Sequence, residues 1–122
     1  MYQKKIANTL NCGSVLTKEV LHGKWKSTLL ACIAQGIQRP SAMQRTIPSA
    51  TRRVLNVQLA ELEHHGLVSK TIFPELPPRV EYQLTDLGRS LLPVIEVMEH
   101  WGNTHRAELE QVLAGNLAKL PD

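Results

Sequence analysis

Apolar residues recur at helical spacing in the first third of the chain. From Gly23 to Ala34 they follow the i, i+4, i+7, i+8 pattern of a helix with one buried face, and they are Trp25, Leu29, Cys32 and Ile33. We therefore predict a helix over this segment, with Trp25 and Cys32 in the core. A shorter helix is predicted before it, from Ser14 to His22.

Two further helices joined by a short turn are predicted next. The first opens at Pro40, with Ser41 placed to cap it. The second runs from Arg52 to about His65, with Thr51 as its cap. Its buried stripe consists of Leu55, Leu59 and Leu62. Two helices in this arrangement predict a helix-turn-helix.

After Gly66 the pattern changes to the period of a strand. Residues 67–73 and 80–84 predict two paired strands, joined by the proline-rich segment from Pro74 to Arg79. Prolines cannot donate to a strand ladder, so pairing stops there and the tip is stiff. Helices followed by a two-stranded hairpin predict a mainly α fold with a small β wing, the winged helix-turn-helix.

A long final helix is predicted over residues 85–115, with Thr85 as its cap and a kink near Pro93 or Gly102. Its apolar stripe contains Leu87, Leu91, Val94, Ile95, Met98 and Trp101. A domain of this size is too small to cover that stripe. We therefore expect a homodimer whose interface is formed by Leu91, Val94, Ile95, Met98 and Trp101. The alternative is that the helix folds back onto the core.

Composition and charge add a partner to this fold. The chain has 122 residues, 43% of them hydrophobic, so residues 1–122 fit one domain with its own core. Residues 20–60 carry six basic and no acidic side chains, whereas residues 86–122 carry three basic and six acidic ones. A positive surface on one part of a small domain is typical of proteins that bind the phosphate backbone of double-stranded DNA. A solvated positive face without a partner is the alternative.

Several function classes have no support in the sequence. No apolar run approaches the roughly 18 residues that span a membrane, and residues 1–10 lack the apolar block of a signal peptide, so we expect a cytoplasmic protein. Two cysteines, outside any CxxC pair, are expected to be thiols. The spacing of the histidine pairs, His64 with His65 and His100 with His105, does not favour a metal site. We expect no cofactor, and no catalytic residue pattern indicates an enzyme.

The candidate DNA-binding residues lie on the helix-turn-helix and the hairpin. Arg53 and Asn56 lie on the outward face of the second helix and have side chains that pair with guanine and adenine edges. Further candidates for contact with DNA are Ser41, Arg45, Thr51, Arg52, Lys70 and Arg79. For Arg79 the alternative is an ion pair with Glu75 or Glu81, in a rigid turn that packs on the protein itself.

Three motifs carry a family resemblance. They are Gly23-Lys24-Trp25, Leu59-x-x-Leu62-Glu63-x-x-Gly66-Leu67-Val68, and Pro77-Pro78-Arg79-Val80-Glu81-Tyr82-x-Leu84-Thr85-x-x-Gly88. Over residues 11–102 the chain resembles the HxlR-type winged-helix regulators of bacteria, a branch similar to the MarR group. The resemblance implies a homodimeric DNA-binding transcription factor, with a pseudo-palindromic operator and an interface made by the first and last helices.

The chain departs from the family pattern at three positions. Pro40 stands where a phenylalanine usually follows arginine, Met43 replaces a leucine, and Gly13 replaces the proline after Cys12. Cys12 itself falls where several members carry a cysteine that senses oxidants or electrophiles. The resemblance therefore makes Cys12 a redox-sensing candidate, with an inert thiol as the alternative. The effector would be an oxidant or a small molecule.

A different class of function also fits a winged helix. The fold could serve as a protein-interaction module that has lost DNA binding and docks a partner through its wing or acidic tail. Salt dependence separates the two readings. Each phosphate contact contributes about −0.9 to the slope of log binding constant against log salt concentration, and apolar docking contributes no such slope.

Overall fold

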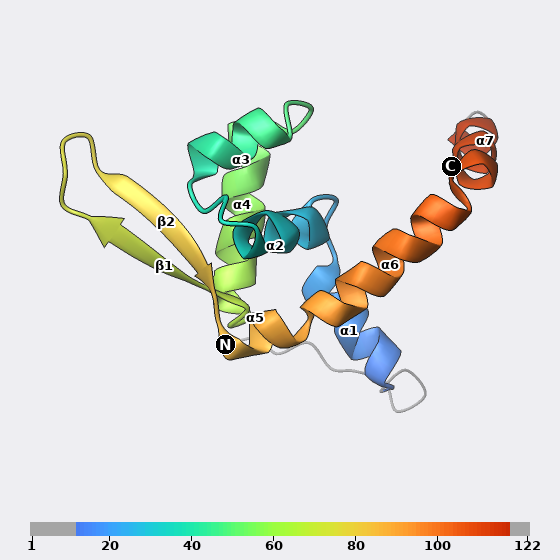
Figure 1. The fold of residues 1–122 in the computed structure, drawn as a ribbon, viewed down its shortest axis with the longest axis horizontal. Coiled ribbons are helices and arrows are strands. Elements are labelled where there is room, and N and C mark those ends of the chain that lie inside the picture. Colours follow the sequence, from blue (N-terminus) through green and yellow to red (C-terminus); the bar gives the residue numbers. More distant parts are fainter. Residues whose placement is uncertain (1–11, 118–122) are drawn as a thin grey trace. The chain divides into compact units, whose positions relative to one another are not determined.

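The computed structural model describes residues 12–117, and the chain forms two compact units, one ending at Ser90 and the next beginning at Leu91. Residues 1–10, on which the expectation of no signal peptide rests, lie outside the described residues. The described elements of the first unit are α1 (Gly13–Leu21), α2 (Lys26–Ala34), α3 (Pro40–Thr46), α4 (Arg52–His64), β1 (Val68–Phe73), β2 (Arg79–Leu84) and α5 (Asp86–Ser90). Figure 1 shows the hairpin extending away from α2, α3 and α4. The predicted mainly α fold with a two-stranded wing is confirmed.

Glycines end α2 and α4 in the same way. Gly36 and Gly66 have positive φ angles of 89° and 76°, a conformation that glycine adopts without strain. After α4, the Leu67 N–H donates to Leu62 O over 3.0 Å and the Gly66 N–H donates to Glu63 O. This is the Schellman pattern, and it turns the chain from α4 directly into β1.

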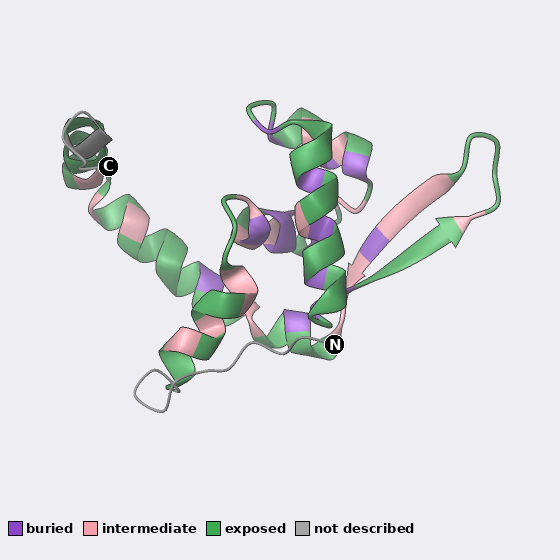
Figure 2. Ribbon diagram, turned by 180° about the vertical axis from the view of Figure 1, so that it is seen from behind, coloured by how far each residue is buried: buried purple, intermediate pink, exposed green. Residues whose placement is uncertain are grey.

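The core of the first unit lies between α2, α3 and α4 (Figure 2). Its fully buried side chains include Leu29, Leu30, Met43, Leu55, Leu59 and Leu62. The predicted stripe of α4 is therefore entirely in the core. The Lys26 residue is also buried, and its Nζ lies 3.6 Å from Glu61 Oε1 on α4.

Two helix starts differ from the sequence-based expectation. Residues 23–25 form a turn, so α2 begins at Lys26 and Trp25 is its half-buried N-cap, whereas Cys32 is buried as expected. The Trp25 N–H donates to Gln58 Oε1 over 2.8 Å, which holds this turn against α4 in place of another helical turn. Ser41 does not cap α3: Arg39 is the N-cap and Pro40 occupies the first turn, where its missing N–H costs nothing.

The hairpin is attached to the helices along β2. Its strands pair antiparallel from Val68 opposite Leu84 to Phe73 opposite Arg79. At the middle of β2 the Tyr82 N–H donates to Gln38 O over 2.9 Å, so the segment before α3 adds a single bond to the outer edge of the sheet. The wing is therefore fixed to the helix-turn-helix as well as to α4.

The α5 helix packs closely on the junction between α4 and β1. Thr85 caps it as predicted, since Thr85 Oγ1 accepts from the Gly88 N–H over 3.1 Å and donates to Gly66 O over 2.6 Å. A Cβ at Gly88 would lie 2.0 Å from Leu67 O. Only glycine fits at this position.

The second unit contains α6 (Leu92–Thr104) and α7 (Arg106–Leu117). The prediction of one long helix over residues 85–115 is therefore wrong in its continuity, because the helix is interrupted at Leu91 and again at His105. The first interruption is explained by Pro93, which has no N–H and whose ring excludes a helical carbonyl four residues earlier. The second follows Gly102 and Thr104, both poor helix formers. The kinks expected near Pro93 and Gly102 are thus full breaks.

Candidate nucleic-acid interface

The outward face of α4 presents the side chains expected to read DNA. Arg52, Arg53 and Asn56 are exposed near its start, and Val57 is 53% exposed one position further on. Thr51 Oγ1 accepts from the Val54 N–H over 3.1 Å, which confirms Thr51 as the cap. Neither arginine has an ion-pair partner among residues 12–117. The guanidinium groups are therefore available to an anionic partner at the end of a helix.

The turn before α4 is held in place from α3. The Gln44 side-chain amide donates to Ala50 O, and Ile47 and Ala50 are buried beneath the turn. Of the other candidates, Ser41 is exposed at the start of α3 and Arg45 is exposed in its last turn. Lys70 is exposed on β1. Ser41 and Arg52 both line a cleft between the hairpin tip and the starts of α3 and α4. Arg45 and Lys70 are not part of its lining.

Arg79 is held by acidic neighbours on its own hairpin. Its Nε lies 3.1 Å from Glu75 Oε2 and 3.5 Å from Glu81 Oε2, and its guanidinium carbon lies 3.9 Å from the centre of the Phe73 ring. The geometry is that of ion pairs, since the buried Nε makes no hydrogen bond within the described part of the chain. Arg79 therefore forms ion pairs with both Glu75 and Glu81, which is the alternative that the sequence left open.

Arg39 belongs to the same ion-pair network. Its Nε donates to Glu81 Oε2 over 3.4 Å, so one carboxylate oxygen is shared by arginines from β2 and from the segment before α3. Sequence reasoning did not list Arg39 or Glu81 as site residues. Arg39 stood in the basic window of residues 20–60, but a pairing across 42 residues leaves no local signal.

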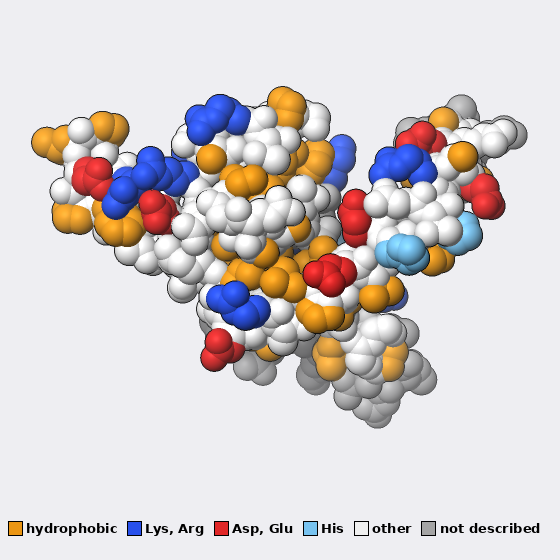
Figure 3. All heavy atoms as spheres, in the orientation of Figure 1, with side chains coloured by type: hydrophobic (Ala, Val, Ile, Leu, Met, Phe, Trp, Pro, Cys, Tyr) orange, Lys and Arg blue, Asp and Glu red, His pale blue; other side chains and the backbone are white. Residues whose placement is uncertain are grey.

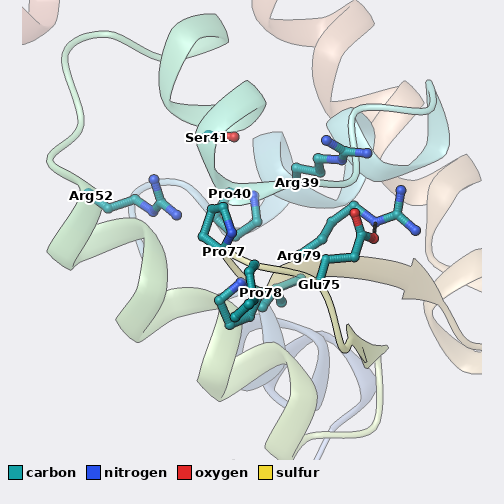
Figure 4. A pocket seen from close by; sticks show the side chains of 10 residues that line it. Arg39, Pro40, Ser41, Arg52, Glu75, Pro77, Pro78 and Arg79 are labelled. Carbon is teal, nitrogen blue, oxygen red and sulfur yellow. Dashed lines mark ion pairs between the residues drawn. The ribbon is translucent and has the colours of Figure 1, made fainter.

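A cleft of about 390 Å³ lies between the hairpin tip and the starts of α3 and α4. Figure 4 shows Arg39 and Arg79 on one side of it, with the Glu75 carboxylate against Arg79. Arg52 lies on the other side and extends toward Pro40 and Pro77. The cleft brings together three cations from three separate parts of the first unit.

The surface carries this charge in patches. Figure 3 shows Lys and Arg side chains on the hairpin, beside acidic ones, and above the helices at the top of the first unit. In β2, burial raises the pKa of Tyr82, and the charge of Glu63 adds to that shift while Arg52 opposes it. Tyr82 therefore remains a neutral phenol, and the charge of the interface comes from its arginines and glutamates.

The two cysteines differ in environment. Cys12 is exposed at the start of α1, with its Sγ 3.3 Å from Ser14 Oγ. That hydrogen bond, followed by one from the Val15 backbone, lowers the pKa of the Cys12 thiol. Cys32 is buried and free, and desolvation raises its pKa. Of these two thiols, Cys12 is thus the one whose exposure and lowered pKa favour reaction with oxidants and electrophiles.

The predicted dimer stripe lies in the second unit. Val94, Met98 and Trp101 of α6 are 41%, 48% and 57% exposed, Leu91 is half-buried, and Ile95 is buried. The Trp101 ring lies 5.0 Å from the ring of His105. Large apolar side chains left open along one helix form the kind of surface that mediates association.

Two other kinds of site are absent from the part of the chain that the structure describes. Within residues 12–117, no group of three histidine, cysteine, aspartate or glutamate side chains is placed to hold a metal ion. Over the same residues, no helix has the length and apolar character that crossing a bilayer requires.

Comparison with known proteins places this fold and surface in context. The sequence pattern of the family described as "HxlR-like helix-turn-helix" matches residues 20–110. Two Bacillus subtilis (strain 168) proteins, each named as an uncharacterized HTH-type transcriptional regulator, are similar. YybR is 38% identical over 92% of this chain and 90% of its own, and YkvN is 44% identical over 75% and 78%.

A solved structure shares the fold at comparable identity. The redox regulator HypR in its reduced form superposes with a TM-score of 0.75 and 39% identity, covering 82% of this chain and 99% of its own.

Proposed function

Since this chain belongs to the HxlR-like helix-turn-helix family of transcriptional regulators, we propose that it binds a specific, pseudo-palindromic operator as a homodimer. Family membership also agrees with the expectation that the chain is not an enzyme, because the family and its relatives are regulators. A regulator of this kind works in the cytoplasm, where the chromosome lies.

One observation carries the proposal of base reading. The start of α4 presents Arg52, Arg53 and Asn56 to solvent while Leu55 and Leu59, on the same helix, are fully buried. An α-helix fits the major groove, and residues at its amino end reach base edges there. Arg53 and Asn56 are proposed to read bases, and Thr51 and Arg52 to contact phosphates.

Selection of bound duplexes from a random library tests this assignment. We expect a palindromic sequence to be enriched. On that sequence, Arg53→Ala should cost about 1–3 kcal/mol of binding free energy and blur the preference at one base pair. Arg89→Ala removes an exposed arginine of α5 and serves as the control with unchanged binding. No enriched sequence would contradict the proposal and favour a protein-docking module.

The homodimer is supported by the open apolar face of α6. A two-fold pair of chains would bury that face and would place two α4 helices about 34 Å apart or wider, matching half-sites one helical turn apart or more. A palindromic operator follows from the same two-fold symmetry.

A redox response is supported by Cys12, by its lowered pKa and exposure, and by the likeness to a protein named as a redox regulator. We propose that the Cys12 thiol forms a disulfide with a second thiol, while an oxidant such as diamide takes up the two electrons and two protons. This change shifts the dimer between two arrangements with different operator affinity. Diamide treatment should then change operator affinity in the native chain and in Cys32→Ser, but not in Cys12→Ser. An equal response of Cys12→Ser would remove Cys12 as the sensor and leave operator binding standing.

A further inference from the structure

The cleft between the hairpin tip and the starts of α3 and α4 has features of a binding site in its own right. Its volume, about 390 Å³, falls in the range of pockets that take small molecules. Prolines form part of its lining, among them Pro40, Pro77 and Pro78. Because proline has no N–H, these residues offer a rigid wall without donors of their own. Side chains must supply the polar contacts.

The polar groups of the cleft are mainly cationic. Arg39, Arg52 and Arg79 line it, with the exposed Ser41 hydroxyl at the start of α3, and Glu75 is the one acidic residue of the lining. Glu81 pairs with Arg39 and Arg79 from β2. The three guanidinium groups thus exceed the two nearby carboxylates by one positive charge. Arg52 has no ion-pair partner among the described residues.

The existing ion pairs leave most donors of these arginines unused. A guanidinium carries five N–H groups. Arg39 and Arg79 approach their glutamates through Nε. Within residues 12–117, the terminal nitrogens of these two side chains make no hydrogen bond. The side chains are 51% and 31% exposed, so solutes can reach them. Glu81 therefore orients the guanidinium groups of Arg39 and Arg79 and leaves most of their N–H donors without a hydrogen-bond acceptor.

We propose that this cleft is an oxyanion site, in which a phosphate-type group is bound by Arg52 on one side and by Arg39 and Arg79 on the other. Planar guanidinium groups bind phosphate oxygens through paired N–H donors, and a partly enclosed setting strengthens those bonds. The anion has two sources of the same chemistry: a DNA backbone phosphate or a free organic phosphate. The first source alone rests on the proposed operator binding.

Titration with inorganic phosphate, without DNA and with chloride adjusted to constant ionic strength, tests the site directly. The readout is the NMR signal of each arginine Nε–H in the full chain. We expect saturable shifts at Arg39, Arg52 and Arg79 that fit one Kd, and no such shift at Arg89. Shifts that grow linearly and equally at all arginines would overturn the proposal.

Variants with opposite expected signs separate binding from folding. Arg52→Gln should weaken phosphate at least about 10-fold, because a hydrogen bond between charged groups is lost. Glu75→Gln should tighten it about 2- to 5-fold, because a carboxylate in the lining is neutralised at an exposed position. An unfolded variant cannot bind more tightly, so unchanged affinity in Glu75→Gln together with unchanged affinity in Arg52→Gln would overturn the site.

A second arm identifies the source of the anion. If a DNA phosphate enters the cleft, Arg39→Gln, which removes a cleft arginine with no other proposed DNA contact, should reduce the slope of log affinity against log salt for operator binding by about 0.9. Phosphate should then compete with DNA beyond its ionic-strength effect. If the ligand is a free anion, the slope is unchanged while phosphate still binds. Failure of phosphate binding with operator selection intact removes this site alone. Failure of operator selection with phosphate binding intact removes the regulator proposal alone.

Discussion

Gly88 lies so close to the Leu67 backbone that no side chain fits between them. A methyl group there would meet Leu67 O at 2.0 Å, inside any allowed contact. We expect Gly88→Ala to lower the free energy of unfolding by about 3 kcal/mol, the upper range for overpacking, as measured by urea denaturation. Gly102→Ala is the matched control, because no atom beyond its own helix lies within 4 Å of the new Cβ. It should be neutral or stabilise by up to about 1 kcal/mol. Equal losses in both variants would contradict this account.

Cys12 gives a prediction that depends on pH. Its pKa is lowered, chiefly by the Ser14 hydroxyl, so thiolate is present at a lower pH than for an ordinary cysteine. The rate of iodoacetamide alkylation at Cys12 should therefore rise at lower pH than for a cysteine peptide, and Cys32, buried and raised in pKa, should react far more slowly. Ser14→Ala should move the Cys12 midpoint upward. A midpoint that does not move would show that the Ser14 bond does not control the thiolate.

At the scale of single residues, the sequence predicts which side chains are exposed better than it predicts which residues they pair with. The exposure of Arg53 and Asn56 follows from their positions relative to Leu55, which periodicity supplies. The partners of Arg79 do not follow from the sequence, because Glu75 lies in the hairpin tip and Glu81 is shared with Arg39 from a distant segment. The structure shows the ion pairs with both glutamates, and contact of Arg79 with DNA stays a prediction.

At the scale of the element, the start of α4 rests on one cap. Thr51 Oγ1 accepts from the Val54 N–H, one of the donors that a helix start leaves unpaired. Thr51→Ala should lower the free energy of unfolding by about 1 kcal/mol, and Thr51→Ser, which keeps the hydroxyl, by only a few tenths. Chemical denaturation of both variants measures the difference. Equal losses would mean that the threonine methyl group, and not the cap, supplies the stability.

Elements with strong local signals were predicted well, and the differences lie where tertiary contacts decide. The α4 helix, its cap and its glycine stop follow from neighbouring residues, as do the hairpin and its proline tip. The start of α2 does not, because the turn before it is held by Gln58 from α4, whose side-chain oxygen accepts from the Trp25 N–H. The apolar residues of α5, α6 and α7 follow one continuous helical period, so periodicity alone did not indicate the two breaks between these helices.

For the whole molecule, the central expectation is a dimer held through α6. Trp101→Glu places a charge on the exposed apolar face and should shift the protein from dimer to monomer in sedimentation velocity, with weaker operator binding as a result. Glu96→Lys changes charge on the opposite side of the same helix and should leave the dimer intact. A dimer that survives Trp101→Glu would place the interface elsewhere.

The two faces of α4 have a consequence for how such proteins diversify. Leu55, Leu59 and Leu62 are fully buried in the core, whereas Arg53, Asn56 and Val57 are exposed. Exposed positions of this kind tolerate substitution with little loss of stability. On the proposed reading of bases by α4, gene duplicates can therefore acquire new binding sequences by changes on one face without passing through unfolded intermediates. A genome can hold many such paralogues, each with its own target, built on a single set of leucines.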